Sequence, residues 1–519
     1  MNIASLLENS SRWWPNQKAL IQPYKIASIS PKEYTYEELN KIVNRFGNAL
    51  TGLGIKKEDR VAVFLPNCTE LTISWFALAK IGAVMVALNS IYKSSETEFI
   101  LNNSEVETVI VDEERLNVIN EIRDKVPLLN KIILVGDKPK PNTLFFNELV
   151  KESSDDLTAL NVPPEFPLVI GYTGGTTGFP KGAVMPHDSY LFAGTVAAAR
   201  IHAYHERIVN VIPMSHTYVR LVQTLSILSG STLIILERFY PNNPDYTLKV
   251  LSDYKATVFT VNTTIMTYLN AIPDEILKKY DINNLRIAVT GGAPLPWDIM
   301  KEFEKKFKTR VIEFYGLTET TPMVASWPIW LQPKPGSCGI PAEGVDVKIW
   351  NEKNEEVPRG EVGEIVVKGP LVMKEYWKNP DATKEAFLYG YFHTGDIGKM
   401  DEDNCLYVID RKKDVILVGG FNVYPTEVES VIAAHPKVLE CAVVGVPHEK
   451  LGEAPIAIIT LKPGEKATEE EIIEFCKTKL AAYKVPRRVF FRSELPHSTV
   501  GWKVLRRVLR EEYKNSLKS

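Results

Sequence analysis

The stretch PLVIGYTGGTTGFPKG, residues 167–182, decides the fold expected of this chain. Its first six residues are mostly apolar and predict a strand, and a loop rich in Gly and Thr follows directly. At a strand end, such a loop lets backbone amides converge on an anion. Glycines permit close approach of phosphate, while hydroxyls and Lys181 add donors and positive charge. The stretch therefore predicts a triphosphate site at a strand end.

This loop differs from the common P-loop, G-x-x-x-x-G-K-[ST], because Lys181 stands between Pro180 and Gly182. An ordinary P-loop NTPase is therefore disfavoured. A flexible surface turn is the usual alternative for a Gly-rich loop, and ten residues in this order argue against it. The expected phosphate ligands are Thr173, Gly174, Gly175, Thr176, Thr177 and Lys181.

Outward from this loop, short β-branched runs alternate with longer helix-like segments. These runs are residues 60–65, 108–111, 131–135, 232–236 and 257–261. The alternation argues for an α/β protein with largely parallel sheets. Near the C-terminus, a helix at 427–434, strands at 441–446 and 456–461 and a capped helix at 468–480 suit a small α+β domain. The charged stretch 410–414 is the strongest candidate boundary.

The size and composition of the chain restrict its class. A chain of 519 residues is too long for one core, so several domains are expected. Its net charge of −3 gives no bulk attraction to nucleic acid or anionic membranes. Five scattered cysteines fit a reducing, cytoplasmic setting, and the N-terminus lacks the apolar run of an export signal. Because Lys80 and Gly82 interrupt the most apolar stretch, 71–88, we expect no membrane span.

Further motifs follow the loop in a fixed order. They are TGGAPLP at 290–296, YGLTET at 315–320, YFHTGD at 391–396, DRKKD at 410–414 and GGFNVYPTEVE at 419–429. With them, residues 5–510 resemble the superfamily of acyl-CoA synthetases, nonribosomal-peptide adenylation domains and luciferases. The resemblance implies a large adenylation domain, residues 1–412, with parallel-type β-sheets sandwiched by helices, and a small mobile α+β domain, residues 413–519.

By this resemblance, the motifs assemble an ATP site. Tyr315 stacks on adenine, Thr318 contacts phosphate and Glu319 holds Mg²⁺ as a hard oxygen ligand. Asp396 accepts hydrogen bonds from ribose, and Arg411 adds a second contact. The other residues expected at the nucleotide are Gly291, Gly292, Ala293 and Gly316. Without the family context, the first motif is a strand-to-helix turn and an Asp after Gly is ordinary turn chemistry.

The resemblance also implies parts that serve coenzyme A. Lys413 is the hinge about which the C-terminal domain turns between two half-reactions. Gly419, Gly420 and Phe421 then lie along the pantetheine tunnel. His216, in IPMSHTY, lies at the wall between the carboxylate pocket and this tunnel. Taken alone, these features would be a solvated charged loop, a hairpin turn and a structural histidine.

One motif departs from the family pattern. The family ends with P-K-T-x-x-G-K and an L-R-R tail, and its lysine neutralises charge on the carboxylate and α-phosphate. Here residues 496–507 read PHSTVGWKVLRR. Counting forward from Pro496 places Trp502 at the lysine position, whereas counting backward from the tail places Lys503 there. Lys503 is therefore the expected catalytic lysine, and the alternative is a surface lysine beside a packing tryptophan.

The reaction implied by the resemblance is that of an AMP-forming acyl-CoA synthetase. A small carboxylic acid, ATP and CoA are the substrates, Mg²⁺ is the cofactor, and no nucleic-acid partner is expected. Bulky Tyr218, Trp327 and Trp330 favour a short or medium acyl chain. One alternative is an adenylating enzyme that passes the acyl group to a carrier protein or oxidises it. Another is a non-catalytic nucleotide-binding homologue, against which Glu319 and Asp396 argue. A homodimer is a family-level expectation.

Overall fold

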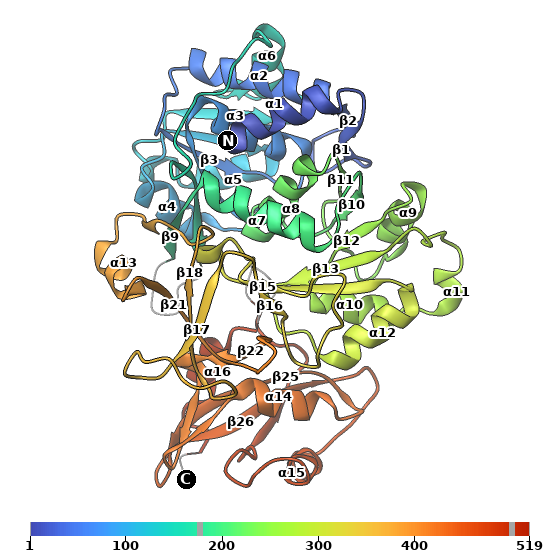
Figure 1. Cartoon of the computed structure of the whole chain (residues 1–519), viewed down its shortest axis with the longest axis vertical. Coiled ribbons are helices and arrows are strands. Elements are labelled where there is room, and N and C mark those ends of the chain that lie inside the picture. The colour runs from blue at the N-terminus through green and yellow to red at the C-terminus, as the bar shows by residue number, and fades with distance from the viewer. Residues whose placement is uncertain (1, 174–179, 498–503, 518–519) are drawn as a thin grey trace. The chain divides into compact units, whose positions relative to one another are not determined.

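The computed structural model describes residues 2–173, 180–497 and 504–517 (Figure 1). It has two compact units. The larger unit comprises Met1–Asp346 and Val367–Phe392, and the smaller unit comprises Val347–Val366 and His393–Ser519. The predicted α/β class, with parallel-type sheets and a smaller second part, is confirmed. The expected boundary between residues 412 and 413 concerns a movement about a hinge, so it stays a prediction.

Two sheets with mainly parallel pairing run through the larger unit. The first has the order β16 (Ile340–Pro341), β15 (Ala325–Ser326), β14 (Arg310–Tyr315), β13 (Ile287–Gly291), β12 (Val258–Thr260), β10 (Arg207–Asn210), β11 (Thr232–Ile235), β1 (Lys18–Gln22), β2 (Lys32–Thr35). The second has the order β19 (Glu375–Tyr376), β9 (Lys181–Pro186), β8 (Pro167–Thr173), β4 (Val84–Ala87), β3 (Arg60–Phe64), β5 (Thr108–Asp112), β6 (Lys131–Val135), β7 (Leu144–Phe145). Central strands such as β4 and β5 are buried along their whole length, as parallel strands covered on both faces should be.

Helix α8 (Thr217–Leu228) contacts both sheets. Tyr218 Oη donates a 3.0 Å hydrogen bond to Val289 O of β13. Two residues further on, Arg220 Nη2 lies 3.8 Å from the place that a Cβ on Gly171 of β8 would take. Helix α7 (His187–Arg200) packs along α8 (Figure 1). Because α8 is enclosed on all sides, its sequence is apolar on more than one face.

The other helices of the larger unit surround the sheets. They are α1 (Ile3–Trp13), α2 (Tyr36–Gly52), α3 (Thr69–Ile81), α4 (Ser94–Asn103), α5 (Glu113–Glu121), α6 (Phe146–Glu152), α9 (Asp245–Asp253), α10 (Thr263–Asn270), α11 (Asp274–Leu277), α12 (Trp297–Phe307) and α13 (Pro380–Ala386), with the short strand β20 (Phe387–Leu388) after α13. The apolar stretch 71–88 forms most of α3 and β4, as its sequence predicts. Among the described residues, no helix combines the length and apolarity needed to cross a bilayer.

The smaller unit is built on two further sheets. One pairs β17 (Asp346–Trp350), β18 (Gly363–Lys368), β21 (Tyr391–Met400) and β22 (Leu406–Arg411). The other has the order β24 (Phe421–Val423), β23 (Ile416–Val418), β26 (Gly452–Leu461), β25 (Val438–His448), with β27 (Val489–Phe491) on β26. Helices α14 (Pro425–Ala433) and α15 (Glu469–Lys477) share one core with this second sheet. Helix α16 (Arg506–Tyr513) contributes Leu509 to a separate core.

Candidate active site

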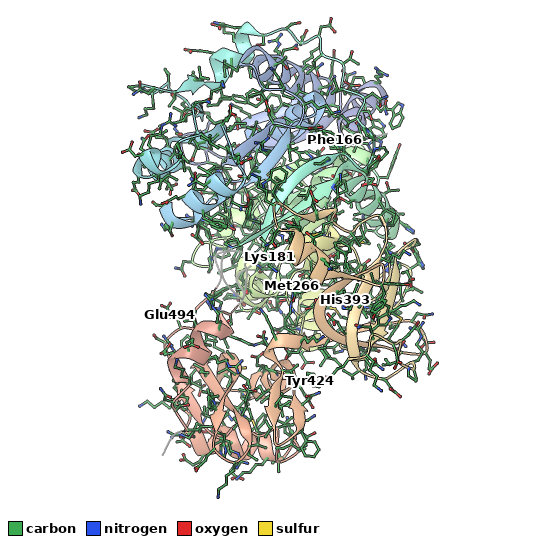
Figure 2. All side chains as sticks on the ribbon, turned by 90° about the vertical axis from the view of Figure 1, so that its left-hand side faces the viewer. Phe166, Lys181, Met266, His393, Tyr424 and Glu494 are labelled. Carbon is green, nitrogen blue, oxygen red and sulfur yellow. The ribbon has the colours of Figure 1, made fainter. Side chains whose placement is uncertain are left out.

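Strands β8 and β9 flank the predicted phosphate loop in the sequence. Thr173 ends β8 and pairs with Lys181, the first residue of β9, and its Oγ1 donates a 3.3 Å hydrogen bond to Lys181 O. Lys181 (Figure 2) places its Nζ 5.1 Å from the centre of the Tyr376 ring. The predicted ligands Gly174, Gly175, Thr176 and Thr177 lie outside the described residues. The strand ends thus bring a cation to an aromatic ring beside the loop.

Glu319 lies in the 3₁₀ turn η2 (Thr318–Thr320) that follows β14. Its side chain is buried, and Tyr376 Oη donates a 2.9 Å hydrogen bond to Glu319 Oε1. Met373 N donates a 2.7 Å hydrogen bond to Glu319 O. Tyr376 therefore contacts both the Lys181 ammonium and the Glu319 carboxylate, so the structure brings these two predicted residues together.

Thr318 lies against the strand that leads to the phosphate loop. A Cβ on Gly171 of β8 would lie 3.0 Å from Thr318 Cγ2. Such a distance is tighter than ordinary van der Waals contact, so the glycine makes room for the threonine. Thr318 is thereby held against Gly171 of β8, which lies two residues before Thr173 in the sequence.

The predicted adenine-binding stretch lies at the C-terminal ends of neighbouring parallel strands. Gly291 ends β13 opposite Phe314 of β14, and a Cβ on Gly291 would lie 2.7 Å from Phe314 O. Gly292 follows with a φ of +86°, which glycine adopts readily. Tyr315 is the last residue of β14. Bare backbone and an aromatic ring therefore lie at adjacent strand ends, where α/β proteins bind ligands.

Two further residues belong to this stretch. A Cβ on Gly316 would lie 2.5 Å from Pro322 Cα, so a side chain is excluded directly after Tyr315. Ala293 is partly buried in the turn between β13 and α12. The stretch is a strand-to-helix turn, and its contact with adenine stays a prediction.

His216 is the N-cap of α8. Tyr218 N donates a 3.3 Å hydrogen bond to His216 Nδ1, which satisfies one of the free amides at the start of the helix. This bond leaves the proton of a neutral imidazole on Nε2. The expected role of His216 at the wall of a coenzyme tunnel stays a prediction beside this capping role.

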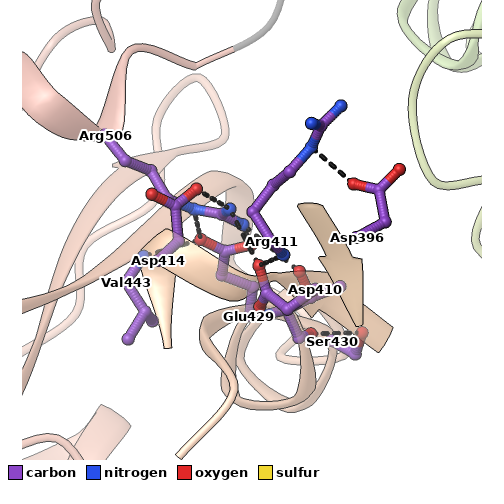
Figure 3. A network of polar contacts seen from close by, with 9 residues as sticks. Asp396, Asp410, Arg411, Asp414, Glu429, Ser430, Val443 and Arg506 are labelled. Atoms are coloured by element: carbon purple, nitrogen blue, oxygen red, sulfur yellow. Dashed lines mark hydrogen bonds and ion pairs between the residues drawn. The ribbon is translucent and has the colours of Figure 1, made fainter. Parts of the chain in front are cut away.

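In the smaller unit, Asp396 of β21 lies opposite Arg411 of β22 in the antiparallel register. Arg411 Nε lies 2.6 Å from Asp396 Oδ1 (Figure 3). Asp396 is 4% exposed, whereas the Arg411 side chain is 38% exposed, so the carboxylate is enclosed and the guanidinium reaches solvent. The two residues predicted to bind ribose are therefore a charge-assisted pair.

The predicted hinge Lys413 lies in the 3₁₀ turn η3 (Lys412–Asp414) between β22 and β23. Arg506, the first residue of α16, reaches the same turn, and its Nη1 lies 3.4 Å from Asp410 Oδ1 and 3.5 Å from Asp414 Oδ2 (Figure 3). Its Nε and Nη2 donate hydrogen bonds of 3.0 and 2.5 Å to the two carboxylate oxygens of Glu429. Three carboxylates on both sides of the hinge thus meet one guanidinium.

The charges of this network shift one another's titration. Burial raises the pKa of Glu429, although the Arg506 charge opposes that shift. Burial would lower the pKa of Arg506, but the nearby charges of Glu429, Asp410 and Asp414 outweigh burial and raise it. Arg506 is therefore charged at all ordinary pH values.

The segment expected along the coenzyme tunnel is a tight hairpin. Val418 pairs with Phe421 across Gly419 and Gly420, whose φ values are +58° and +87°. Two consecutive positive φ values define the turn type that favours Gly-Gly. Phe421 is 59% exposed and stacks on Tyr483, with ring centres 4.9 Å apart. An aromatic ring is thus held at the surface, and its role toward CoA stays a prediction.

The predicted catalytic Lys503 and its neighbour Trp502 lie outside the described residues. The residues on either side are paired with each other, since His497 and Val504 form an antiparallel bridge and Leu505 N donates a 2.8 Å hydrogen bond to Pro496 O. His497 Nε2 lies 2.7 Å from Glu440 Oε1 of β25. The residues that flank this segment, His497 and Val504, therefore lie side by side on the smaller unit.

The profile of the AMP-binding enzyme family matches residues 7–377, and that of the AMP-binding enzyme C-terminal domain matches residues 427–501. The chain belongs to the AMP-binding enzyme family.

Relatives of this AMP-binding enzyme match over nearly their full length. A long-chain-fatty-acid–CoA ligase of Bacillus subtilis is 34% identical, and the match covers 99% of this chain and 95% of that protein. The long-chain-fatty-acid–CoA ligase FadD13 of Mycobacterium tuberculosis is 34% identical over 96% of this chain and 98% of its own. The anthranilate CoA ligase AuaEII in complex with anthranoyl-AMP has a TM-score of 0.91 at 28% identity, covering 99% of this chain and 98% of that one.

Two residues of this AMP-binding enzyme that join predicted site residues escaped sequence reasoning. Tyr376 contacts Lys181 and Glu319, but it lies in the two-residue strand β19 outside any motif. Arg506 was only a marker for counting back to Lys503. The signal that marks it is the pair of acidic residues flanking the hinge, Asp410 and Asp414, which need a counter-charge when buried.

Proposed function

We propose that the chain is an AMP-forming acyl-CoA ligase, which converts a carboxylic acid, ATP and CoA into acyl-CoA, AMP and diphosphate through an acyl-adenylate. The observation that carries the proposal is the full-length match to CoA ligases, one of them with an acyl-adenylate bound. The geometry supports it, because residues at separate sequence positions form the pairs Glu319–Tyr376 and Asp396–Arg411 that such a site would use.

In the proposed first half-reaction, a carboxylate oxygen of the acid attacks the α-phosphorus of ATP and diphosphate leaves. Lys181 and Thr318 offset the charge that grows on the phosphate oxygens. Glu319 would hold Mg²⁺, which screens phosphate charge when bound. Among the described residues no group of three or more His, Cys, Asp or Glu side chains could hold a metal ion. One protein carboxylate is nevertheless enough for Mg²⁺, which takes its other ligands from phosphates and water.

In this proposal, the nucleoside contacts the residues of three sequence motifs. Tyr315 stacks on adenine while the backbone of Gly291, Gly292 and Ala293 lies against it, since no side chain stands in the way. Buried Asp396 accepts hydrogen bonds from the ribose hydroxyls, and Arg411 fixes the orientation of that carboxylate.

In the proposed second half-reaction, the CoA thiol attacks the acyl carbonyl carbon and AMP leaves with the bonding electron pair. The smaller domain turns about Lys413 between the two steps, which withdraws Lys503 and brings Gly419, Gly420 and Phe421 to the coenzyme. The exposed Phe421 ring and the short turn at Lys413 support this assignment.

The acid is the least constrained substrate. We propose a short or medium acyl chain. Tyr218 is buried and its hydroxyl donates a hydrogen bond to Val289 O, so its ring is fixed and would limit the length of the acyl pocket. The two tryptophans add little support: Trp327 is buried with its Nε1 donating to Ser337 O, and Trp330 is 54% exposed and stacks on His202. The names of the curated relatives favour the competing expectation of a long chain.

The test measures AMP and diphosphate with and without CoA, using acetate, butyrate, octanoate, palmitate and benzoate. We expect CoA-dependent AMP release with one class of acid, and Lys503→Ala to lose adenylation while still using supplied acyl-AMP. Lys514→Ala, which alters an exposed lysine of the same C-terminal segment, is the matched control. Failure of every acid to drive AMP release would overturn the ligase assignment.

Two finer expectations complete the proposal. We propose a cytoplasmic location, which the scattered cysteines support, and a homodimer, which is the family-level expectation. Cell fractionation tests the first, and light scattering on the purified chain tests the second.

A further inference from the structure

Arg220 is a buried cation in α8 with an unusual set of neighbours. Its side chain is 1% exposed. Among the residues that the structure describes, no carboxylate oxygen lies within ion-pair distance of it. The residues outside those ranges include no Asp or Glu. Its charge is therefore not balanced by any acidic side chain.

The described residues that Arg220 contacts are all neutral. Nε donates a 3.2 Å hydrogen bond to Tyr190 Oη, and Nη1 donates a 2.6 Å hydrogen bond to Ser215 O. The guanidinium carbon lies 5.8 Å from the centre of the Trp75 ring. Nη2 makes no hydrogen bond to any of the described residues. The two N–H groups of Nη2 therefore have no acceptor among the described residues.

Arg200 of the neighbouring helix α7 shows how this chain otherwise handles a buried arginine. Arg200 is also 1% exposed, but Glu343 Oε2 lies 3.0 Å from its Nε. Its other nitrogens donate to Ser326, Ile340 and Pro341. A buried charge without a counter-charge is costly. An anion that arrives with a ligand would supply for Arg220 what Glu343 supplies for Arg200.

The position of Nη2 indicates which ligand brings that anion. Nη2 lies 3.8 Å from the place that a Cβ on Gly171 would take, and Thr318 Cγ2 lies 3.0 Å from the same place. Gly171 precedes Thr173 by two residues on β8. The free end of Arg220 is thus beside the strand and the threonine to which the phosphate contacts are assigned.

We infer that Arg220 binds an oxyanion of the reactants at this position, either a phosphate oxygen of ATP and diphosphate or the carboxylate of the acid. The identity of the ligand rests on the proposed function, whereas the uncompensated charge does not. Gly171 is part of the same site, because a methyl group there would occupy the space between Nη2 and Thr318. Arg220 thus belongs to substrate binding and is not a packing residue of the core.

The experiment is calorimetric titration of the full chain and its variants with MgATP, with magnesium diphosphate and with each acid of the series above. Arg220→Leu removes the charge, Arg220→Lys keeps it, and Gly171→Ala narrows the space. We expect the Kd of one class of ligand to rise roughly 10- to 100-fold in Arg220→Leu and Gly171→Ala, and less in Arg220→Lys. A change confined to the phosphate ligands identifies phosphate, and a change confined to the acids identifies the carboxylate.

Thermal unfolding without ligands separates this role from a structural one. If Arg220 serves to bind a ligand, Arg220→Leu unfolds at or above the wild-type temperature. Arg200→Leu unfolds below it, because the carbonyl oxygens of Ser326, Ile340 and Pro341 lose their donor. Gly171→Ala and Arg220→Lys retain the charge and the fold. The inference would be overturned if both variants bound both ligand classes with Kd values within about twofold of wild type. Wild type that binds neither MgATP nor diphosphate would instead overturn the proposed function.

Discussion

Among single residues, Glu319 and Tyr376 are the most closely coupled part of the candidate site. The carboxylate is buried and receives the Tyr376 hydroxyl, and the same ring contacts Lys181. Acid, phenol and ammonium therefore form a chain in which each group restricts the rotamers of the next. A carboxylate oriented in advance loses little freedom when its ligand binds.

Glu319→Gln tests the assignment to Mg²⁺. We expect AMP formation to fall about 100-fold or more, because a neutral amide cannot replace a carboxylate as the protein ligand of the ion. Tyr376→Phe is the matched control, since it keeps the ring beside Lys181 and removes only the hydroxyl, and it should lose less than about 10-fold. The readout is diphosphate release as a function of Mg²⁺ concentration. A Glu319→Gln rate within about twofold of wild type would contradict the assignment.

Asp396→Asn tests the pairing with Arg411. The variant keeps the shape of the side chain but loses the charge that holds the guanidinium. We expect the KM for ATP to rise roughly 10-fold or more while the KM for the acid stays constant, because the proposed site places the nucleoside, and not the acid, against this residue. Equal changes in both constants would point to a general structural effect.

The sequence specified these residues through motifs, and it failed where contacts depend on distant pairing. YGLTET and YFHTGD identify Glu319 and Asp396 without any knowledge of the fold. Tyr376 reaches Glu319 only because β19 pairs with β9, and a two-residue strand leaves no periodic pattern. Arg220 looked like an ordinary helical residue, and its significance comes from the absence of a carboxylate among the described residues around it.

Among the elements, α7 and α1 are joined by a titratable group. His187, the first residue of α7, accepts a 3.3 Å hydrogen bond at Nδ1 from Ile3 N, the first residue of α1. Burial lowers the pKa of His187 to about 4. The folded state therefore holds the neutral form and binds fewer protons than the unfolded state between pH 6.5 and 4.

This linkage predicts a loss of stability in acid. The contribution of neutral His187 is fully present above the unfolded pKa of 6.5 and is lost as pH falls toward 4, by about 3 kcal/mol at most. His187→Asn offers Ile3 N a neutral acceptor and should flatten the pH dependence of unfolding free energy in this range. Parallel pH profiles for variant and wild type would contradict the prediction. Denaturant titration from pH 4 to 8 provides the measurement.

The Arg506 network predicts a second stability effect, located in the smaller unit. Glu429→Gln removes one of three carboxylates from a partly buried guanidinium and should lower the unfolding free energy of that unit by about 1–3 kcal/mol. Glu474→Gln, which alters an exposed pair with Lys477, should leave it unchanged. Urea unfolding followed by tyrosine and tryptophan fluorescence distinguishes the two variants. A Glu429→Gln variant as stable as Glu474→Gln would show that the network carries no net stability.

For the whole molecule, the sequence predicted the class and the succession of strands and helices, but not which segments share a unit. Runs such as 108–111 and 131–135 became parallel strands because every residue after the first is apolar. By contrast, residues 347–366 join residues 393–411 through β18 and β21. Pairing over such distances is set by packing, and no local pattern encodes it.

Lys413→Pro tests the expected domain movement. Proline fixes φ near −65° and would restrict rotation at the turn between β22 and β23. We expect the two half-reactions to separate, with acyl-adenylate formation from acid and ATP largely retained and thioester formation from supplied acyl-AMP reduced about 100-fold. Lys412→Pro is the neighbouring control. Equal loss in both half-reactions would mean that proline damages the fold and does not block a turn.

Helix α8 has a consequence for attempts to change the specificity of this enzyme. Tyr218 and Arg220, two residues apart, contact opposite sheets, one on the expected acyl side and one beside β8. Substitutions of Tyr218 that admit bulkier acids will shift helix α8, which also carries Arg220. Selection for a new acid should therefore yield variants whose affinity for the oxyanion at Arg220 has changed as well. Compensating mutations should appear on β8 or α7 before any appear among the residues around the acyl chain.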